Sequence, residues 1–274
     1  MTTTTDSHLL RGYAPITEAG WQQIDQEARQ RLEPQLGARR IVDWAGPYGW
    51  EHSATNLGRS APLKGPPGAD EGAAPSRGRR VLPLAEIRVP FTVSREEIAD
   101  ADRGADDLDL DDLTRAARQL AVAENATVFH GWPGAGFAGI AEATSHEPLS
   151  LGADPAGYPA VVARAVETLR GAGVTGPYAL AVGPAGYTRI VETTEHGGYL
   201  LAEHLRRILG GRLVRAPGVE GAVVASTRGC DFALEVGQDV AVGYHHHDDA
   251  WLSLYLEESL SFRVLEPDAA IALR

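Results

Sequence analysis

Apolar residues recur every three or four positions near the start of the chain, and this spacing predicts an amphipathic helix. The segment is 17-TEAGWQQIDQEARQRLEPQLG-37. Its apolar stripe consists of Trp21, Ile24, Ala28, Leu32 and Leu36. Thr17 can cap the first turn and Gly37 can end the helix. Because Pro34 lacks a backbone N–H, we expect the helix to weaken or bend near its last turn.

The same periodicity predicts three more helices in the first three quarters of the chain. One spans about residues 109–128, with Leu113, Ala117, Leu120 and Ala121 on one face. A second begins at Asp154, an N-cap followed by Pro155, and runs to Gly171 with Val162, Ala165, Val166 and Leu169 inside. The third carries Leu201, Leu205, Ile208 and Leu209 before the Gly210–Gly211 stop. Between the last two helices, 178-YALAV-182 reads as a short buried strand.

From Arg212 onward the apolar pattern changes to the short runs typical of strands. The runs are LVRA, GAVVAST, DFALEVG, DVAVGY, WLSLYLE and LSFRVLE. Helices come early and strands come late, without regular alternation. This order favours an α+β fold over a doubly wound sheet.

Residues 53–80 interrupt this pattern with a stretch rich in Gly and Pro. Such a segment cannot form a core of its own. It is followed at once by the strand-like 81-VLPLAEIRVPFTV-93. Because a loop of this size inside a compact domain is usually disordered or functional, we expect an extended arm held by neighbouring chains.

Composition and net charge limit the classes of function that this chain can have. The chain has 274 residues, one cysteine, Cys230, and a net charge of −12. A single cysteine excludes an intrachain disulfide framework and fits a reducing compartment. No secretory leader or run of about 18 apolar residues is visible, so we expect a soluble cytoplasmic protein without membrane contact. The negative charge disfavours nucleic acid as a partner, and the acidic run at 100–112 reads as a solvated face or helix entry.

Three stretches invite a catalytic or binding interpretation. The sequence 134-GAGFAG-139 matches the dinucleotide fingerprint, but a helix precedes it and no strand–turn–helix frame surrounds it, so we expect a glycine-rich turn. Cys230 stands in a Gly-Cys-Asp turn without a nearby histidine, and no GxSxG motif is present. His245, His247 and Asp249 could converge on a metal ion; their position between two strands favours an exposed hairpin tip instead.

Seven stretches, in order along nearly the whole chain, are similar to the type 1 encapsulin family of bacterial shell proteins, formerly grouped with linocin-type bacteriocins. They are 13-YAPITEAGWQQIDQEA-28, 37-GARRIVDWAGPYGWE-51, 83-PLAEIRVPFT-92, 121-AVAENATVFHGW-132, 176-GPYAL-180, 229-GCDFALEVGQDVAVGY-244 and 257-EESLSFRVLEP-267. The resemblance implies the tailed-phage capsid fold of the Hong Kong 97 type, with a peripheral domain, an axial domain and an extended loop.

The implied domain boundaries follow from this resemblance. The peripheral domain comprises 1–52 with the N-terminal helix, 93–133 with the long helix, and 226–274 with the C-terminal strands. The extended loop is 53–92. The axial domain is 134–225.

The resemblance also implies a function without catalysis by this chain. A shell, with a T=1 assembly of sixty copies favoured, encloses a cargo enzyme, a ferritin-like iron-storage protein or a dye-decolorizing-type peroxidase, through the cargo's C-terminal peptide. The positions that match the family's peptide site are Leu32, Arg39, Asp43, Asp239 and Val242. The alternative for this set is that Leu32 belongs to the core and that Arg39 pairs with Asp43 within the chain.

By the same resemblance, the fivefold pore loop is 195-EHGGY-199, comprising Glu195, His196, Gly197, Gly198 and Tyr199. His196 could make passage depend on pH, or be a solvated loop residue. Some family members bind flavin through a tryptophan where this chain has Glu96, so we expect no flavin; no metal or other cofactor is predicted. Two rival functions stay open: a metal-dependent enzyme built on His245, His247 and Asp249, and a genuine phage major capsid protein.

Overall fold

The computed structural model describes residues 8–68, 74–195 and 197–274, and its α+β architecture confirms the predicted fold class. The larger sheet has the strand order β1-β8-β10-β4, with β9 also paired to β10. Its strands are β1 (Asp43–Ala45), β4 (Ala85–Ser94), β8 (Phe232–Val236), β9 (Ala241–His247) and β10 (Trp251–Val264). β10 is antiparallel to β4, β8 and β9, and therefore forms the centre of this sheet.

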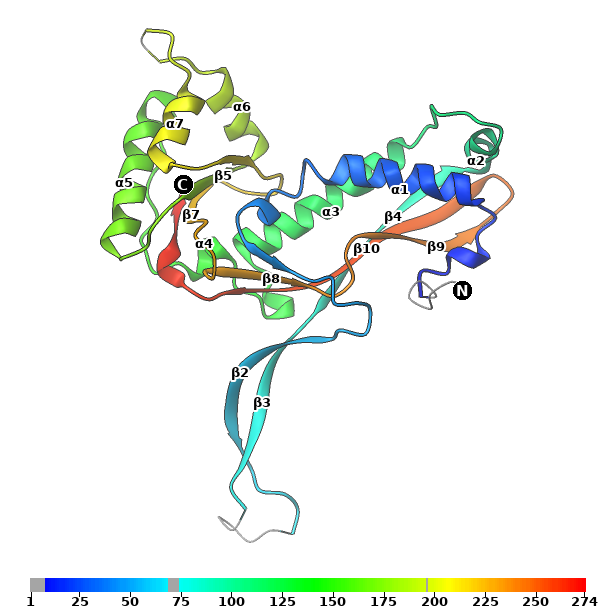
Figure 1. Ribbon diagram of the computed structural model, residues 1–274, viewed down its shortest axis with the longest axis horizontal. Coiled ribbons are helices and arrows are strands. Elements are labelled where there is room, and N and C mark those ends of the chain that lie inside the picture. The colour runs from blue at the N-terminus through cyan, green and yellow to red at the C-terminus, as the bar shows by residue number, and fades with distance from the viewer. Residues whose placement is uncertain (1–7, 69–73, 196) are drawn as a thin grey trace.

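Three helices accompany the larger sheet: α1 (Glu18–Leu32), α2 (Arg95–Asp102) and α3 (Asp111–His130). α1 and α3 pack against each other and over the sheet (Figure 1). One apolar cluster joins them to it, with Ile24 from α1, Leu113 and Leu120 from α3, and Leu254 from β10 fully buried. The predicted apolar face of the long helix is thus confirmed.

A second sheet, in the order β11-β7-β5-β6, lies at the other end of the molecule with α5 and α7 beside it (Figure 1). Its strands are β5 (Tyr178–Val182), β6 (Leu213–Arg215), β7 (Ala222–Ser226) and β11 (Ala270–Leu273). The accompanying helices are α4 (Ile140–Ala143), α5 (Tyr158–Gly171), α6 (Pro184–Glu192) and α7 (Leu201–Leu209). Every residue of β5 is buried, as its uninterrupted apolar sequence predicts. Asp154 caps a 3-10 turn, Pro155–Gly157, that leads into α5.

α1 begins at the predicted position, but it ends earlier than the predicted Gly37. The Thr17 hydroxyl accepts a hydrogen bond from the Gly20 N–H at 3.2 Å, which confirms the predicted cap. The helix ends at Leu32, well before Gly37, and a turn follows. Pro34 accounts for the early end, because it has no backbone N–H to donate to the Gln30 carbonyl, although Glu33 before it still has helical geometry. Short 3-10 helices occur at Arg11–Tyr13, Ala38–Arg40, Pro133–Ala135 and Pro267–Ala269.

The Gly- and Pro-rich segment is more regular than its composition suggests. β2 (Ala54–Leu63) and β3 (Ser76–Pro83) pair as an antiparallel hairpin, which we call the β2–β3 arm. It projects away from both sheets (Figure 1). The predicted strand 81–93 is divided at Leu84, so that its first residues belong to the arm and the rest form β4.

The late strands also differ from the prediction in two places. WLSLYLE and LSFRVLE form one continuous strand, β10, because the central Glu257 and Glu258 are buried within the sheet instead of forming a turn. β11 pairs with β7, so the last strand lies in the second sheet and not with the other strands of 226–274. The domain boundaries as a whole stay a prediction.

Candidate functional site

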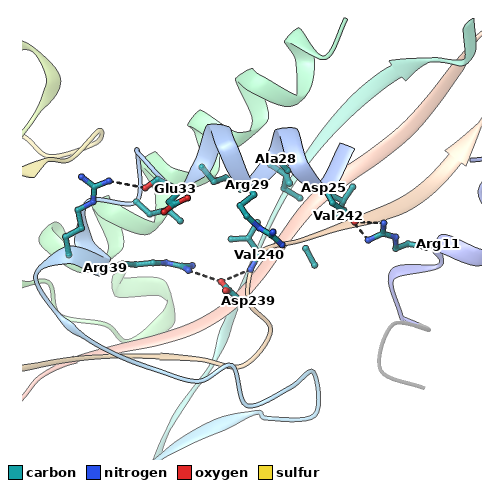
Figure 2. Close-up of a pocket in the computed structure, with 14 residues that line it drawn as sticks. Arg11, Asp25, Ala28, Arg29, Glu33, Arg39, Asp239, Val240 and Val242 are labelled. Atoms are coloured by element: carbon teal, nitrogen blue, oxygen red, sulfur yellow. Dashed lines mark hydrogen bonds and ion pairs between the residues drawn. The ribbon is translucent and has the colours of Figure 1, made fainter. Parts of the chain in front are cut away.

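A groove lies between α1 and the start of β9, and we call it the α1–β9 groove (Figure 2). It has a volume of about 710 Å³. Its apolar lining consists of Ala28, Leu32, Leu36, Val240, Ala241, Val242 and Leu256. Its charged lining consists of Arg11, Asp25, Arg29, Glu33, Arg39, Arg40 and Asp239. The lining is therefore an apolar floor with charges of both signs around it.

Four of the five residues predicted for peptide binding meet in this groove. Leu32 comes from the last turn of α1, Arg39 from the 3-10 turn after it, and Asp239 and Val242 from the entry to β9. Leu32 is 5% and Val242 2% exposed, so both belong to the core and show only an edge to the groove. Leu32 is therefore a core residue that also reaches the groove, and its contact with a peptide stays a prediction.

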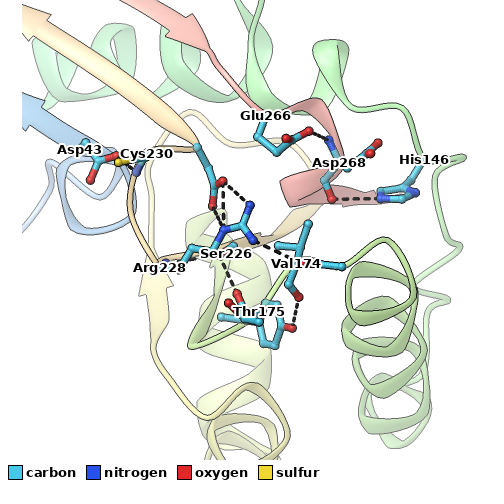
Figure 3. A network of polar contacts seen from close by, with 12 residues as sticks. Asp43, His146, Val174, Thr175, Ser226, Arg228, Cys230, Glu266 and Asp268 are labelled. Atoms are coloured by element: carbon cyan, nitrogen blue, oxygen red, sulfur yellow. Dashed lines mark hydrogen bonds and ion pairs between the residues drawn. The ribbon is translucent and has the colours of Figure 1, made fainter.

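Asp43 does not line the groove. β1 pairs with β8 in parallel, and this pairing brings Asp43 to the turn before β8, where its carboxylate accepts the Cys230 N–H at 2.5 Å (Figure 3). The alternative ion pair between Arg39 and Asp43 is therefore wrong.

Arg39 instead binds three other carboxylates. Its Nε donates to Glu124 Oε2 at 2.7 Å, its Nη1 to Asp239 Oδ1 at 2.8 Å and its Nη2 to Glu258 Oε1 at 2.8 Å. The Glu124 and Glu258 side chains are 0% exposed, whereas that of Asp239 is 42% exposed. Arg39 thereby connects α3, β10 and the entry to β9 behind the groove.

The two buried glutamates in this network share one cation. Burial raises the pKa of Glu258 well above its ordinary value, and the adjacent Glu124 raises it further by its charge and a hydrogen bond. Burial alone would lower the pKa of the Arg39 guanidinium, but the charges of Glu124 and Glu258 outweigh it and raise that pKa. The charge of Arg39 is therefore stabilised, whereas the charged form of Glu258 is disfavoured.

Sequence reasoning missed Glu124 and Glu258. The one available signal was the pair Glu257–Glu258 between two apolar runs, and it reads equally well as a turn. Glu257 faces a separate partner, since its carboxylate pairs with Arg88 from β4. Each buried glutamate of β10 thus has its own arginine, a pairing that only the fold reveals.

The predicted pore loop forms a tight turn between α6 and α7. The Glu195 N–H donates to the Tyr199 carbonyl at 2.8 Å, and the Gly198 N–H donates to the Glu195 carbonyl at 3.0 Å. Gly197 and Gly198 have φ of 91° and 80°, a region that favours glycine. The Glu195 carboxylate lies 2.8 Å from Nδ1 of His204 on α7, and the Tyr199 ring meets the same imidazole edge-on. His196 lies outside the described residues.

The histidines lie in a strand and not at the hairpin tip. β9 continues to His247, which pairs with Leu252, and only Asp248, Asp249 and Ala250 connect it to β10. A bulge at His245 breaks the two-residue alternation, and His247 Nδ1 lies 2.5 Å from the Tyr244 hydroxyl.

No group of three or more His, Cys, Asp or Glu side chains that could hold a metal ion occurs among the described residues. His245, His247 and Asp249 are therefore not gathered into a metal site.

The other motifs are structural. Phe137 of GAGFAG forms an isolated β-bridge with Trp132, directly after α3, and this bridge confirms a turn. The motif does not follow a strand, as a dinucleotide site requires. Cys230 is exposed with φ of 64°. Within residues 8–68, 74–195 and 197–274, no helix is both long and apolar enough to span a bilayer.

Comparison with known proteins agrees with this architecture. Residues 6–261 match the family described as "Encapsulating protein for peroxidase" (Linocin_M18). The type 1 encapsulin shell protein of Rhodospirillum rubrum is 47% identical over 97% of this chain and 96% of its own length. That of Mycobacterium tuberculosis is 40% identical over 97% and 99%.

Among solved structures, the virus-like particle from Pyrococcus furiosus covers 93% of this chain and 99% of its own, with a TM-score of 0.60 and 17% identity. The capsid of the native GTA particle covers 87% and 89%, with a TM-score of 0.53 and 15% identity. These structures show the Hong Kong 97-like capsid fold, and the relatives are named shell proteins, not enzymes. The chain belongs to the type 1 encapsulin shell protein family.

Proposed function

We propose that this chain assembles into a closed icosahedral shell, with a T=1 particle of sixty copies favoured, and that the shell encloses a cargo enzyme. Family membership and the capsid fold support assembly. The observation that carries the proposal is the β2–β3 arm, which extends away from the body with its outer face uncovered (Figure 1). An exposed two-stranded hairpin is marginally stable by itself and has open edges, so a neighbouring copy is its natural support.

The assembly proposal is tested by size-exclusion chromatography and negative-stain microscopy of the purified chain. We expect closed particles of uniform diameter. A species that elutes near the 29.1 kDa monomer at every concentration, without closed particles, contradicts the proposal.

We further propose that the α1–β9 groove faces the interior and binds the C-terminal peptide of the cargo. Its apolar floor suits a short extended segment with alternating apolar side chains. The exposed Asp239 at its edge is held in place by Arg39 and can orient a polar or basic group of the peptide. The catalytic activity of the compartment, iron storage or peroxide chemistry, then belongs to the cargo.

Peptide docking is tested by replacing Asp239, the most exposed member of the Arg39 network. In Asp239→Lys a second cation faces Arg39, and we expect cargo loading to fall about tenfold, which corresponds to about 1.4 kcal/mol. The measurement is the cargo-to-shell ratio after co-expression with a dye-decolorizing-type peroxidase that carries its own C-terminal peptide.

Asp43→Ala is the matched control, because Asp43 lies outside the groove. It should load like the wild type. Unchanged loading in Asp239→Lys, with intact shells, would show that the peptide binds elsewhere. If cargo loading falls in Asp43→Ala but not in Asp239→Lys, the result would instead favour the peptide site that the resemblance implies for Asp43.

Small solutes must cross such a shell, and we propose that they pass at the fivefold axes through the loop 195–199. The tight turn with two glycines suits a narrow constriction. We place the particle in the cytoplasm, as for a compartment loaded inside the cell.

A further inference from the structure

The β2–β3 arm is basic on balance. Residues 54–83 carry five basic side chains and two acidic residues, Asp70 and Glu71, which lie outside the described residues, in a chain whose net charge is −12. The five are Arg59, Lys64, Arg77, Arg79 and Arg80, and all are exposed. The arm therefore differs in sign from the protein that carries it.

The strand register brings these cations together. Arg59 lies directly opposite Arg80, and Arg79 lies opposite Ser60. Like charges in opposing positions of a hairpin destabilise it. Arg77 donates to Ser60 Oγ at 2.8 Å, but the Arg59, Arg79 and Arg80 guanidinium groups have no hydrogen-bond or ion-pair partner among the described residues.

The arm also exposes apolar surface, at Leu63 toward its outer end and at Val81 near its base. Leu63 is 59% and Val81 50% exposed. The body holds only the base of the arm, where Thr55 Oγ1 lies 2.5 Å from Ser261 Oγ of β10. A partner that stabilises the arm must therefore supply carboxylates and cover apolar side chains in the same contact.

The chain contains a complementary segment. The loop between α2 and α3 exposes Asp106 and Asp107, which have no hydrogen-bond or ion-pair partner among the described residues. This loop lies at the end of the molecule that bears α2, far from the arm (Figure 1). Because the arm and the loop of one copy lie far apart, a contact between them requires a second copy.

We propose that the cations of the β2–β3 arm bind the Asp106–Asp107 loop of a second copy of this chain, so that ionic strength controls shell closure. This inference rests on the proposed shell function and names the contact that drives it. Nucleic acid is the rival partner for a basic arm; the net charge of the chain disfavours it.

The first test is the salt dependence of assembly. Raising NaCl from about 0.1 M to about 1 M shortens the Debye length from ~10 Å to ~3 Å and screens exposed charges. We expect the chain concentration needed for half-maximal assembly to rise at least about tenfold over this range. Assembly that is indifferent to salt overturns the inference and leaves the proposed function intact; failure to assemble at any salt concentration overturns the proposed function as well.

The second test is charge exchange. Arg79→Glu with Arg80→Glu should block assembly of a chain that keeps its far-ultraviolet circular dichroism. Adding Asp106→Arg and Asp107→Arg to the same chain should restore particles. The control, Arg164→Glu on α5, makes a charge change of the same sign at an exposed site outside the arm and should assemble normally.

Three results overturn the inference. They are assembly of the Arg79→Glu, Arg80→Glu variant at wild-type concentrations, failure of the loop exchange to restore a blocked arm variant, and an arm variant that loses only co-purified nucleic acid while its particles stay intact.

Discussion

At the scale of single residues, the side chains behind the α1–β9 groove are organised by Arg39. Its Nε, Nη1 and Nη2 atoms each donate to a different carboxylate, from Glu124, Asp239 and Glu258. A guanidinium used in this way has little capacity left for a bound peptide. We therefore regard Arg39 as a positioning residue that fixes Asp239 and the walls of the groove.

Glu124 and Glu258 each have one carboxylate oxygen that Arg39 does not contact, and these two oxygens indicate how both glutamates can be buried side by side. Glu124 Oε1 and Glu258 Oε2 are both buried and have no hydrogen-bond donor among the described residues. We expect that one proton on Glu258, donated to Glu124, satisfies both atoms and removes the repulsion between two buried anions. The raised pKa of Glu258, caused first by its burial, agrees with this arrangement.

This arrangement predicts how stability responds to pH. Because the pKa of Glu258 is higher in the folded chain than its ordinary value of 4.5, the folded chain binds the extra proton above that pH. Its contribution to stability is complete below about pH 4.5 and is lost as pH rises through the raised pKa, with a slope of up to about 1.4 kcal/mol per pH unit.

Glu258→Gln tests the shared proton. The amide can still donate to Glu124 and accept from Arg39, so we expect the variant to fold. Its free energy of unfolding should increase relative to that of the wild type as pH rises above about 4.5. Denaturant unfolding at a series of pH values measures the difference. Glu192→Gln, which removes an exposed carboxylate on α6, is the control. Parallel pH profiles for wild type and Glu258→Gln would exclude a proton on Glu258.

Four of the five residues that the resemblance implies for peptide binding lie together in the groove, although they come from separate segments. The four are Leu32, Arg39, Asp239 and Val242, and their role in peptide binding stays a prediction. Asp43 does not join them, because the parallel pairing of β1 with β8 turns it toward Cys230. Glu124 lies on the buried side of a helix and Glu258 at a strand centre, and no local pattern marks such positions as charged partners.

At the scale of elements, the segments with a clear apolar pattern were predictable, including the short α7 and β5, whereas two other short helices were not. The apolar stripes of α1, α3, α5 and α7 and the buried strand β5 follow from spacing alone. α2 and α6 have 8 and 9 residues and were not predicted. With barely two turns each, they form because tertiary packing holds them. The β2–β3 arm was expected to be extended, but its regular pairing is invisible in a composition of Gly, Pro and Arg.

α3 supports both the first sheet and the groove, and its buried face should therefore be sensitive to truncation. Leu120 is 0% exposed in the cluster between α1, α3 and the first sheet. Leu120→Ala should cost about 2–5 kcal/mol and lower the thermal unfolding temperature, because the lost side chain leaves a cavity. Arg118→Ala, on an exposed position of the same helix, should unfold within a few degrees of the wild type. An equal effect of both changes would contradict the packing described for α3.

At the scale of the whole molecule, the architecture could be predicted from the order of the segments that resemble the family, and much less from the periodicity of apolar residues. The spacing of apolar residues predicts helices and strands but not which strands pair. β10 runs through 14 residues across the first sheet, and β11 crosses to the second. These long-range pairings depend on contacts between residues far apart in sequence, which local patterns do not encode.

Electron cryomicroscopy of particles co-expressed with a peptide-bearing peroxidase can reveal both the proposed shell and the side on which the α1–β9 groove lies. We expect a closed icosahedral shell, with each β2–β3 arm lying on a neighbouring copy and extra density along Leu32, Val242 and Asp239 on the interior face. Monomers, open sheets, or a closed shell with the groove on its outer surface would exclude the proposed function.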